Sequence, residues 1–173
     1  MYKKLVVLLS ISALALSACG GKTETNATPN GEHQDLVETG APDASGAVGG
    51  DIDLGNGVTI KLSQPEHFTP SQFASNYVKG NTANLFEASI TNSGSKAIDW
   101  ATVSFVTTST GGSACPDVLD GDSGVNGQPT GTLAAGATET FKFGIACSTK
   151  PGAELNVSIT VGDKTAAVNG KVA

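Results

Sequence analysis

Apolar and polar side chains alternate with a period of two residues through much of the chain after residue 57. The alternation is clearest at Val58, Ile60 and Leu62, which are separated by polar residues, and it recurs in the segments 86–91, 101–105, 141–147, 155–161 and 165–172. A β-strand sends successive side chains to opposite faces of its sheet, so this pattern indicates strands with one buried face. No stretch shows a convincing apolar repeat at helical spacing.

Turn residues separate the predicted strands. Asn92-Ser93-Gly94-Ser95 follows one segment, and Gly162-Asp163 lies between Val161 and Lys164, where a two-residue hairpin loop favours glycine first. Short alternating strands joined by glycine-containing turns are typical of antiparallel sandwiches. We therefore predict that residues 51–173 form an all-β, immunoglobulin-like antiparallel β-sandwich of about seven strands.

The first residues have the features of a bacterial lipoprotein signal. Lys3 and Lys4 precede an apolar run over residues 5–16, which is shorter than the roughly 20 residues needed to cross a bilayer. Leu16-Ser17-Ala18 then leads directly to Cys19. We predict that residues 1–18 are a signal peptide and that Cys19 carries the lipid, palmitate included, that holds the protein on the outer face of the bacterial cytoplasmic membrane. The alternative is a secreted protein in which Cys19 is incidental.

The segment from Gly20 to Gly50 contains no aromatic residue and is rich in Gly, Thr, Asn, Pro and Ala. Such a composition cannot bury enough apolar surface to offset the entropy of ordering it. We expect residues 19–50 to be a lipidated, disordered tether.

The charge of the chain restricts its partners. The formal net charge is −6, and all ten basic residues are lysines. Without arginine or a basic stripe, the chain lacks the means to neutralise a nucleic-acid backbone. We predict no binding to nucleic acid.

Two cysteines remain after Cys19. Paired cysteines are usual in exported domains, so we predict a disulfide between Cys115 and Cys147. A redox role is the alternative, but it would favour closely spaced cysteines or an electropositive surrounding.

Catalytic and metal-binding patterns are scarce. His67 is the only histidine after residue 50, and a lone histidine cannot make a copper site. No Gly-x-Ser-x-Gly elbow presents a nucleophile for a Ser-His-Asp triad, and we expect His67 to be a solvated loop residue. We predict no enzymatic activity and no cofactor. The weak candidate for a metal is calcium at Asp117, Asp120 and Asp122, in a glycine-rich loop, and the alternative is a solvated acidic loop.

Several turn-and-strand motifs carry a family resemblance. They are Gly57-Val58-Thr59-Ile60, Phe68-Thr69-Pro70-Ser71, Ile90-Thr91-Asn92-Ser93-Gly94-Ser95 and Leu133-Ala134-Ala135-Gly136-Ala137 before Phe141-Lys142-Phe143. With these motifs, the domain resembles the immunoglobulin-like domain of actinobacterial surface lipoproteins of unknown function and, more distantly, the secreted mycobacterial immunoprotective antigen. The resemblance implies a fold and an exported location, but no catalytic residue. True immunoglobulin domains place a Trp between their two cysteines, whereas Trp100 precedes both.

Together these features favour a tethered, non-enzymatic binding or interaction module at the cell surface. The expected partner, besides the membrane, is an envelope protein or a cell-wall polymer, contacted through the long loop region 109–131. An accessory lipoprotein that captures a solute for a transporter is the second hypothesis, and an enzyme with an unrecognised site is the third. The ligand and the oligomeric state stay open.

Overall fold

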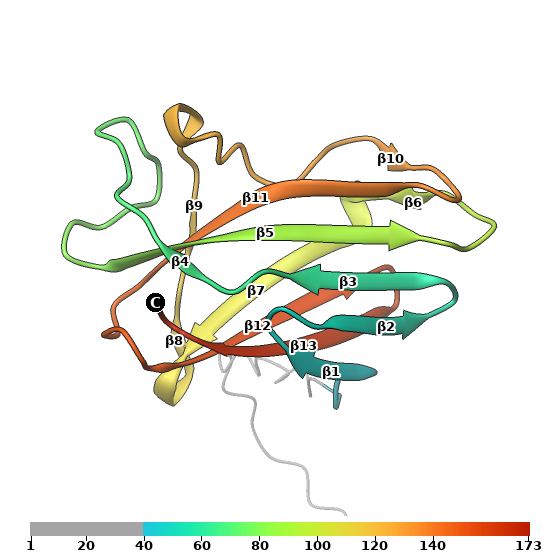
Figure 1. The fold of residues 1–173 in the computed structure, drawn as a ribbon, viewed down its shortest axis with the longest axis horizontal. Helices are drawn as coiled ribbons and strands as arrows, with labels where there is room; N and C mark the ends of the chain where they lie inside the picture. The colour runs from blue at the N-terminus through green and yellow to red at the C-terminus, as the bar shows by residue number, and fades with distance from the viewer. Residues whose placement is uncertain (1–39) are drawn as a thin grey trace, which may run out of the picture. The chain divides into compact units, whose positions relative to one another are not determined.

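The computed structural model describes residues 40–173, which form two β-sheets around one core (Figure 1). The predicted signal peptide, Cys19 and the tether up to residue 39 lie outside the described residues. Within residues 40–173, no helix is long and apolar enough to cross a membrane.

The first sheet has five strands, and two of them come from the chain's last hairpin. Its order is β1 (Ala44–Ala47), β13 (Lys164–Lys171), β12 (Glu154–Val161), β7 (Val103–Ser109) and β8 (Ser113–Ala114). β12 and β13 pair from Glu154↔Lys171 to Val161↔Lys164, which confirms the predicted two-residue loop at Gly162-Asp163. Gly162 has the positive φ of 63° that such a loop requires.

The second sheet is built around one long central pair. Its order is β2 (Asp51–Gly55), β3 (Val58–Leu62), β5 (Thr82–Asn92), β11 (Thr138–Cys147) and β9 (Asp117–Val118), and β4 (Glu66–His67) also pairs with β5. β5 and β11 pair over ten residues each. A small ladder joins β6 (Ile98–Asp99) to β10 (Thr132–Leu133), and three 3₁₀ turns complete the described residues: η1 (Trp100–Thr102), η2 (Thr110–Gly112) and η3 (Gly121–Ser123).

The predicted fold class is confirmed. Seven of the described strands, β2, β3, β5, β7, β11, β12 and β13, have five or more residues. The two sheets bury their alternating apolar residues against each other in a single core cluster. Ile60, Phe86 and Ile145 come from the second sheet and Val157 and Ile159 from the first, and each is at most 1% exposed. Burial of these side chains is the main stabilising contribution.

Aromatic rings join the two sheets. Phe105 of β7 lies with its ring centroid 4.8 Å from that of Phe143 and 5.8 Å from that of Phe141, both on β11. Trp100 packs edge-on against Phe141 at 5.6 Å and donates a hydrogen bond from Nε1 to Glu139 Oε2 at 3.1 Å. The single tryptophan is therefore a structural residue with its polar group satisfied.

The predicted disulfide is present. Cys115 follows β8 of the first sheet, Cys147 ends β11 of the second, and their Cα atoms are 4.4 Å apart. Both cysteines are buried. The bond therefore links the two sheets, as a structural disulfide does.

Two predictions about the fold were wrong in detail. Residues 44–47 were expected in the disordered tether, but they form β1, which pairs with β13 in parallel rather than antiparallel register. A Cβ on Gly46 would lie 2.7 Å from Ile52 Cγ1 of β2, so glycine at this position lets β1 lie close to β2 while it pairs with β13. Ala101 was expected on an inward strand face, but it is exposed in η1, where Asp99 Oδ1 accepts a hydrogen bond from its amide.

Candidate functional site

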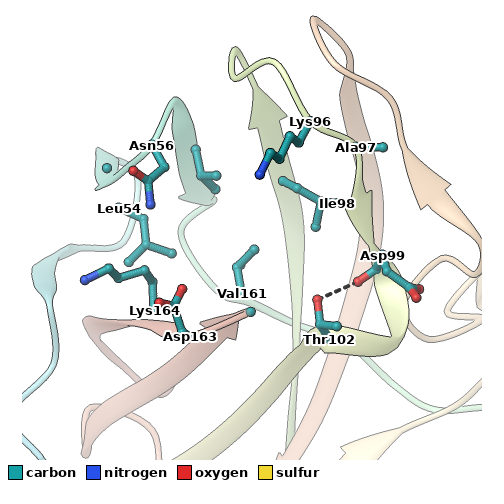
Figure 2. A pocket seen from close by; sticks show the side chains of 13 residues that line it. Leu54, Asn56, Lys96, Ala97, Ile98, Asp99, Thr102, Val161, Asp163 and Lys164 are labelled. Carbon is teal, nitrogen blue, oxygen red and sulfur yellow. Dashed lines mark hydrogen bonds between the residues drawn. The ribbon is translucent and has the colours of Figure 1, made fainter.

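A pocket of about 450 Å³ opens at the end of the sandwich where two hairpins meet (Figure 2). Its walls come from the β2–β3 hairpin, the segment from Lys96 to Asp99 with the adjacent Thr102, and the β12–β13 hairpin. These three walls are far apart in the sequence, and both sheets contribute to them. A cavity of this size is within the range of small-molecule sites.

The interior of the pocket is apolar. Leu54, Val58, Ile98 and Val161 line it, and Leu54 and Val161 are at most 7% exposed because they also belong to the core. The pocket floor is therefore an extension of the packed core, and its shape is set by the sandwich itself. An apolar group that enters the pocket would gain about 25 cal/mol for each Å² of apolar surface removed from water.

Two hydrogen-bond donors stand over this floor. Figure 2 shows the Lys96 side chain extending over the cavity and the Asn56 side chain at the opposite wall. Neither the Lys96 ammonium nor the Asn56 amide makes a side-chain hydrogen bond or ion pair within residues 40–173. Asn56 is in the left-handed region with a φ of 54°, where asparagine is tolerated, and this conformation turns the β2–β3 hairpin.

The buried side chain of Asn92 holds the loop that carries Lys96. Asn92 is 1% exposed, and its Nδ2 donates to the carbonyl oxygen of Lys96 at 2.8 Å and to those of Leu133 and Ala134 at 3.2 Å. Its Oδ1 accepts from the Gly94 amide at 3.1 Å. The wall of the pocket is therefore preorganised, which reduces the entropy lost when a ligand binds.

The β2–β3 hairpin and the loop before Lys96, which form two of the pocket walls, also contact each other. The Ser93 amide donates to the Gly57 carbonyl oxygen at 2.7 Å. A Cβ on Gly57 would lie 2.5 Å from the Gly94 nitrogen, and Gly57 has a φ of 80°, so both its space and its conformation require glycine. This contact holds Asn56 and Lys96 on a common frame.

The other charged groups at the rim have partners. Lys164 Nζ lies 2.7 Å from Asp43 Oδ1, and the Thr165 amide donates to Asp43 Oδ2 at 2.9 Å. The Lys164 hydrogen bond, with the Thr165 amide next, lowers the pKa of Asp43 below 3.8, and Asp43 in turn raises the pKa of Lys164. Asp99 caps η1 through its carboxylate. Lys96 is thus the rim cation without an ion-pair partner among the described residues.

The predicted calcium candidate is not supported. Asp120 is 1% exposed, and its carboxylate accepts hydrogen bonds from the Ser71 amide (2.7 Å), Ser71 Oγ (2.8 Å) and Ser123 Oγ (2.9 Å). These bonds, with the Ser71 amide first, hold the pKa of Asp120 below its usual value. Asp117 lies in β9, where burial raises its pKa, and Asp122 lies in η3. Within residues 40–173, no three His, Cys, Asp or Glu side chains gather into a metal-binding group.

The other predicted positions lie away from the pocket. His67 is exposed in β4, and the region 109–131 is ordered by β8, β9, η2 and η3. Gly124, Asn126 and Gly127 of that region line a smaller hollow beside Lys142 on the second sheet. The pocket residues were not predicted. The hairpin at Gly162-Asp163 was recognised, but nothing in the sequence places it beside Lys96.

Fold and pocket together define this chain as a disulfide-linked β-sandwich domain with an open, apolar-floored cavity at one end. No family model matches the sequence, and a search of curated proteins finds no significantly similar sequence. Solved structures do show a related fold.

YcdA of Bacillus subtilis, classed as a lipoprotein, superposes with a TM-score of 0.57 at 13% identity. The match covers 69% of this chain and 38% of the YcdA chain, so it spans well under half of that protein. The secreted protein MPT63 of Mycobacterium tuberculosis has a TM-score of 0.49 at 14% identity, over 77% of this chain and 99% of its own. The likeness to YcdA shows the β-sandwich fold alone, and the resemblance to actinobacterial lipoproteins stays a prediction.

Proposed function

We propose that the chain is an exported bacterial lipoprotein whose sandwich is a non-enzymatic binding domain at the outer face of the cytoplasmic membrane. Its address rests on the sequence Leu16-Ser17-Ala18-Cys19, in which Cys19 receives the lipid. The disulfide between Cys115 and Cys147 is in keeping with this address, because such bonds persist in oxidising compartments.

The pocket at the hairpin end is the observation that carries the binding role. It combines an apolar floor with a small number of polar groups at fixed positions, which is the usual composition of a small-molecule site. Its free polar groups are the Lys96 ammonium, the Asn56 amide and the exposed Asp163 carboxylate, rather than the hydrogen-bonded nucleophile and base that acyl transfer or hydrolysis needs. Binding is therefore the role that these residues can perform.

The second candidate is capture of a solute for a transporter. A single sandwich gives such a protein one open cavity, where a deep enclosed site would retain the solute more firmly. Solute capture would use this pocket, whose apolar floor of Leu54, Ile98 and Val161 can hold a small molecule. The pocket therefore favours solute capture over an interaction through the region 109–131. Envelope proteins and wall polymers are the partners to consider if the pocket is empty in the cell.

The test is whether the protein carries a small molecule when it is isolated from cells that make it. Native mass spectrometry of the wild-type protein is expected to show a bound species. Lys96→Trp, at an exposed position whose side chain extends over the cavity, places a bulky ring in the mouth of the pocket and should abolish the bound species. The matched control is Ala135→Trp in an exposed turn that does not line the pocket. Equal loading of wild type and Lys96→Trp would contradict a binding role for the pocket.

A further inference from the structure

The chemistry of the pocket defines a class of ligand. We propose that it binds a small amphipathic molecule made of an aliphatic or aromatic body and a single acidic group, with the acidic group between Lys96 and Asn56. This inference rests on the proposed binding function and narrows it to one class of molecule.

The size and lining of the cavity set the body of the ligand. A volume of about 450 Å³ holds roughly 15 non-hydrogen atoms if each takes the ~30 Å³ that a water molecule occupies in the liquid. The floor of Leu54, Val58, Ile98 and Val161 presents no polar side chain to the centre of that volume. A sugar or a peptide backbone would leave its hydrogen-bonding groups unpaired against this floor, which costs free energy. An aliphatic chain or an aromatic ring has no such groups.

The charges at the rim set the head group. Asp43 pairs with Lys164, and the Asp99 carboxylate accepts from the Ala101 amide, so the ammonium of Lys96 is the positive charge left to meet a ligand. Figure 2 places the Asn56 side chain across the cavity from Lys96. An ammonium is a donor only and a side-chain amide offers two donors, so a carboxylate or phosphate between them would accept from both.

The negative charges near the pocket also favour a head group with a single negative charge. Asp163 lies at the same rim and is exposed, and it adds to the electrostatic effect of Asp43 on Lys164. The whole chain carries a net charge of −6. A ligand with several negative charges would be repelled by this field, whereas one acidic group is neutralised by Lys96 alone.

The backbone segments that carry the two donors are held in place without a ligand. Asn92 Nδ2 donates to the carbonyl oxygen of Lys96 and so holds the loop of Lys96. The close contact of Gly57 with Gly94 holds the hairpin that carries Asn56. Neither donor depends on the other for its position. Loss of the Lys96 charge therefore removes one contact to the ligand and leaves the apolar floor unchanged.

The experiment compares three eight-carbon probes that differ in charge, each titrated into the purified protein and followed by amide chemical shifts. Octanoate, 1-octanol and octylammonium share one apolar body. Octanoate is expected to bind most tightly, with shifts at Lys96, Ile98 and Val161, and octylammonium least tightly. Lys96→Gln should weaken octanoate binding about threefold to fivefold, as expected for a partly solvated ion pair, and leave 1-octanol binding unchanged. Added salt should have the same selective effect.

The matched control is Lys61→Gln, because Lys61 is an exposed lysine on β3 that does not line the pocket. It should leave all three affinities unchanged. Equal affinity for octanoate and 1-octanol, or preference for octylammonium, would overturn the acidic ligand class and leave the pocket as a binding site. Failure of all three probes to shift the pocket amides would overturn this ligand class as well. The mass-spectrometric comparison of Lys96→Trp with Ala135→Trp still decides the binding role in that case.

Discussion

Asp43 and Lys164 form a contact that fastens the start of the described chain to the hairpin that lines the pocket. Lys164 Nζ lies 2.7 Å from Asp43 Oδ1, and the Asp43 amide donates to the Thr165 carbonyl oxygen at 2.8 Å. The strand β1 begins at the next residue and pairs with β13. Asp43 therefore leads into β1 at the pocket end of the first sheet.

Loss of the Asp43 carboxylate should loosen β1. In Asp43→Asn the ion pair is gone, so we expect the amides of β1 and of Val48 to exchange about twofold to fivefold faster with solvent while those of β5 keep their protection. Asp51→Asn is the control, because Asp51 contacts Lys61 at 3.4 Å with both side chains more than half exposed. Unchanged exchange of β1 in Asp43→Asn would show that its pairing with β13 does not need this contact.

The stabilisation that the Asp43–Lys164 ion pair provides should decrease at both low and high pH. The pKa of Asp43 is lowered in the folded state. Its contribution to the stability of the fold is therefore complete above about pH 3.8 and is lost as the pH falls through the folded-state pKa. The pKa of Lys164 is raised, so its contribution is complete below 10.5 and is lost as the pH rises through its folded value. The difference in melting temperature between wild type and Asp43→Asn should be constant near neutral pH and shrink at both extremes. A difference in melting temperature that grows at acidic pH would contradict a stabilising role for the ionised Asp43 carboxylate.

Asp120 should act as an internal support for two loops rather than as a metal ligand. Its carboxylate joins Ser71 to Ser123, and the neighbouring Leu119 exchanges backbone hydrogen bonds with Ser75. Asp120→Ala should speed amide exchange over residues 71–75 and lower the melting temperature. Millimolar calcium should leave the wild-type melting temperature unchanged, because the Asp120 oxygens already accept three hydrogen bonds. A calcium-dependent rise that a chelator reverses would restore the metal site.

Removal of the disulfide should destabilise the sandwich without changing its fold. Cys115 and Cys147 are 32 residues apart, and the chain-entropy relation gives about 3–4 kcal/mol for closing such a loop. We expect the double variant Cys115→Ala/Cys147→Ala to lose about this free energy of unfolding in urea. A reducing agent should lower the stability of the wild type and have no effect on the double variant. Wild-type stability that is insensitive to reduction would argue against the structural role.

Cys19 should decide where the protein resides. Cys19→Ala is expected to release the protein from the membrane fraction and to abolish its labelling by radioactive palmitate, because the proposed function attaches the lipid to this thiol. Cys115→Ala is a control, since that cysteine pairs within the domain. Full membrane association of Cys19→Ala would contradict the lipoprotein assignment.

The strands were predictable where local pattern and long-range packing agree. Val58, Ile60 and Leu62 alternate with polar residues, and β3 forms at those residues. β1 was missed because Ala-Ser-Gly-Ala has no apolar alternation, and its pairing depends on β13 at the other end of the chain. The pocket was missed for the same reason. Leu54, Ile98 and Val161 each look like an ordinary core residue, and only the folded sheets bring them to one cavity.

The most direct test of the binding role asks which end of the sandwich a ligand protects. Amide hydrogen exchange would be measured with and without the small-molecule fraction of the cell envelope. The proposed site predicts slower exchange at residues 54–58, 96–99 and 161–164, with no change at 68–81 or 109–131. Protection confined to 68–81 and 109–131, with residues 96–99 unaffected, would place binding away from the pocket and contradict the account.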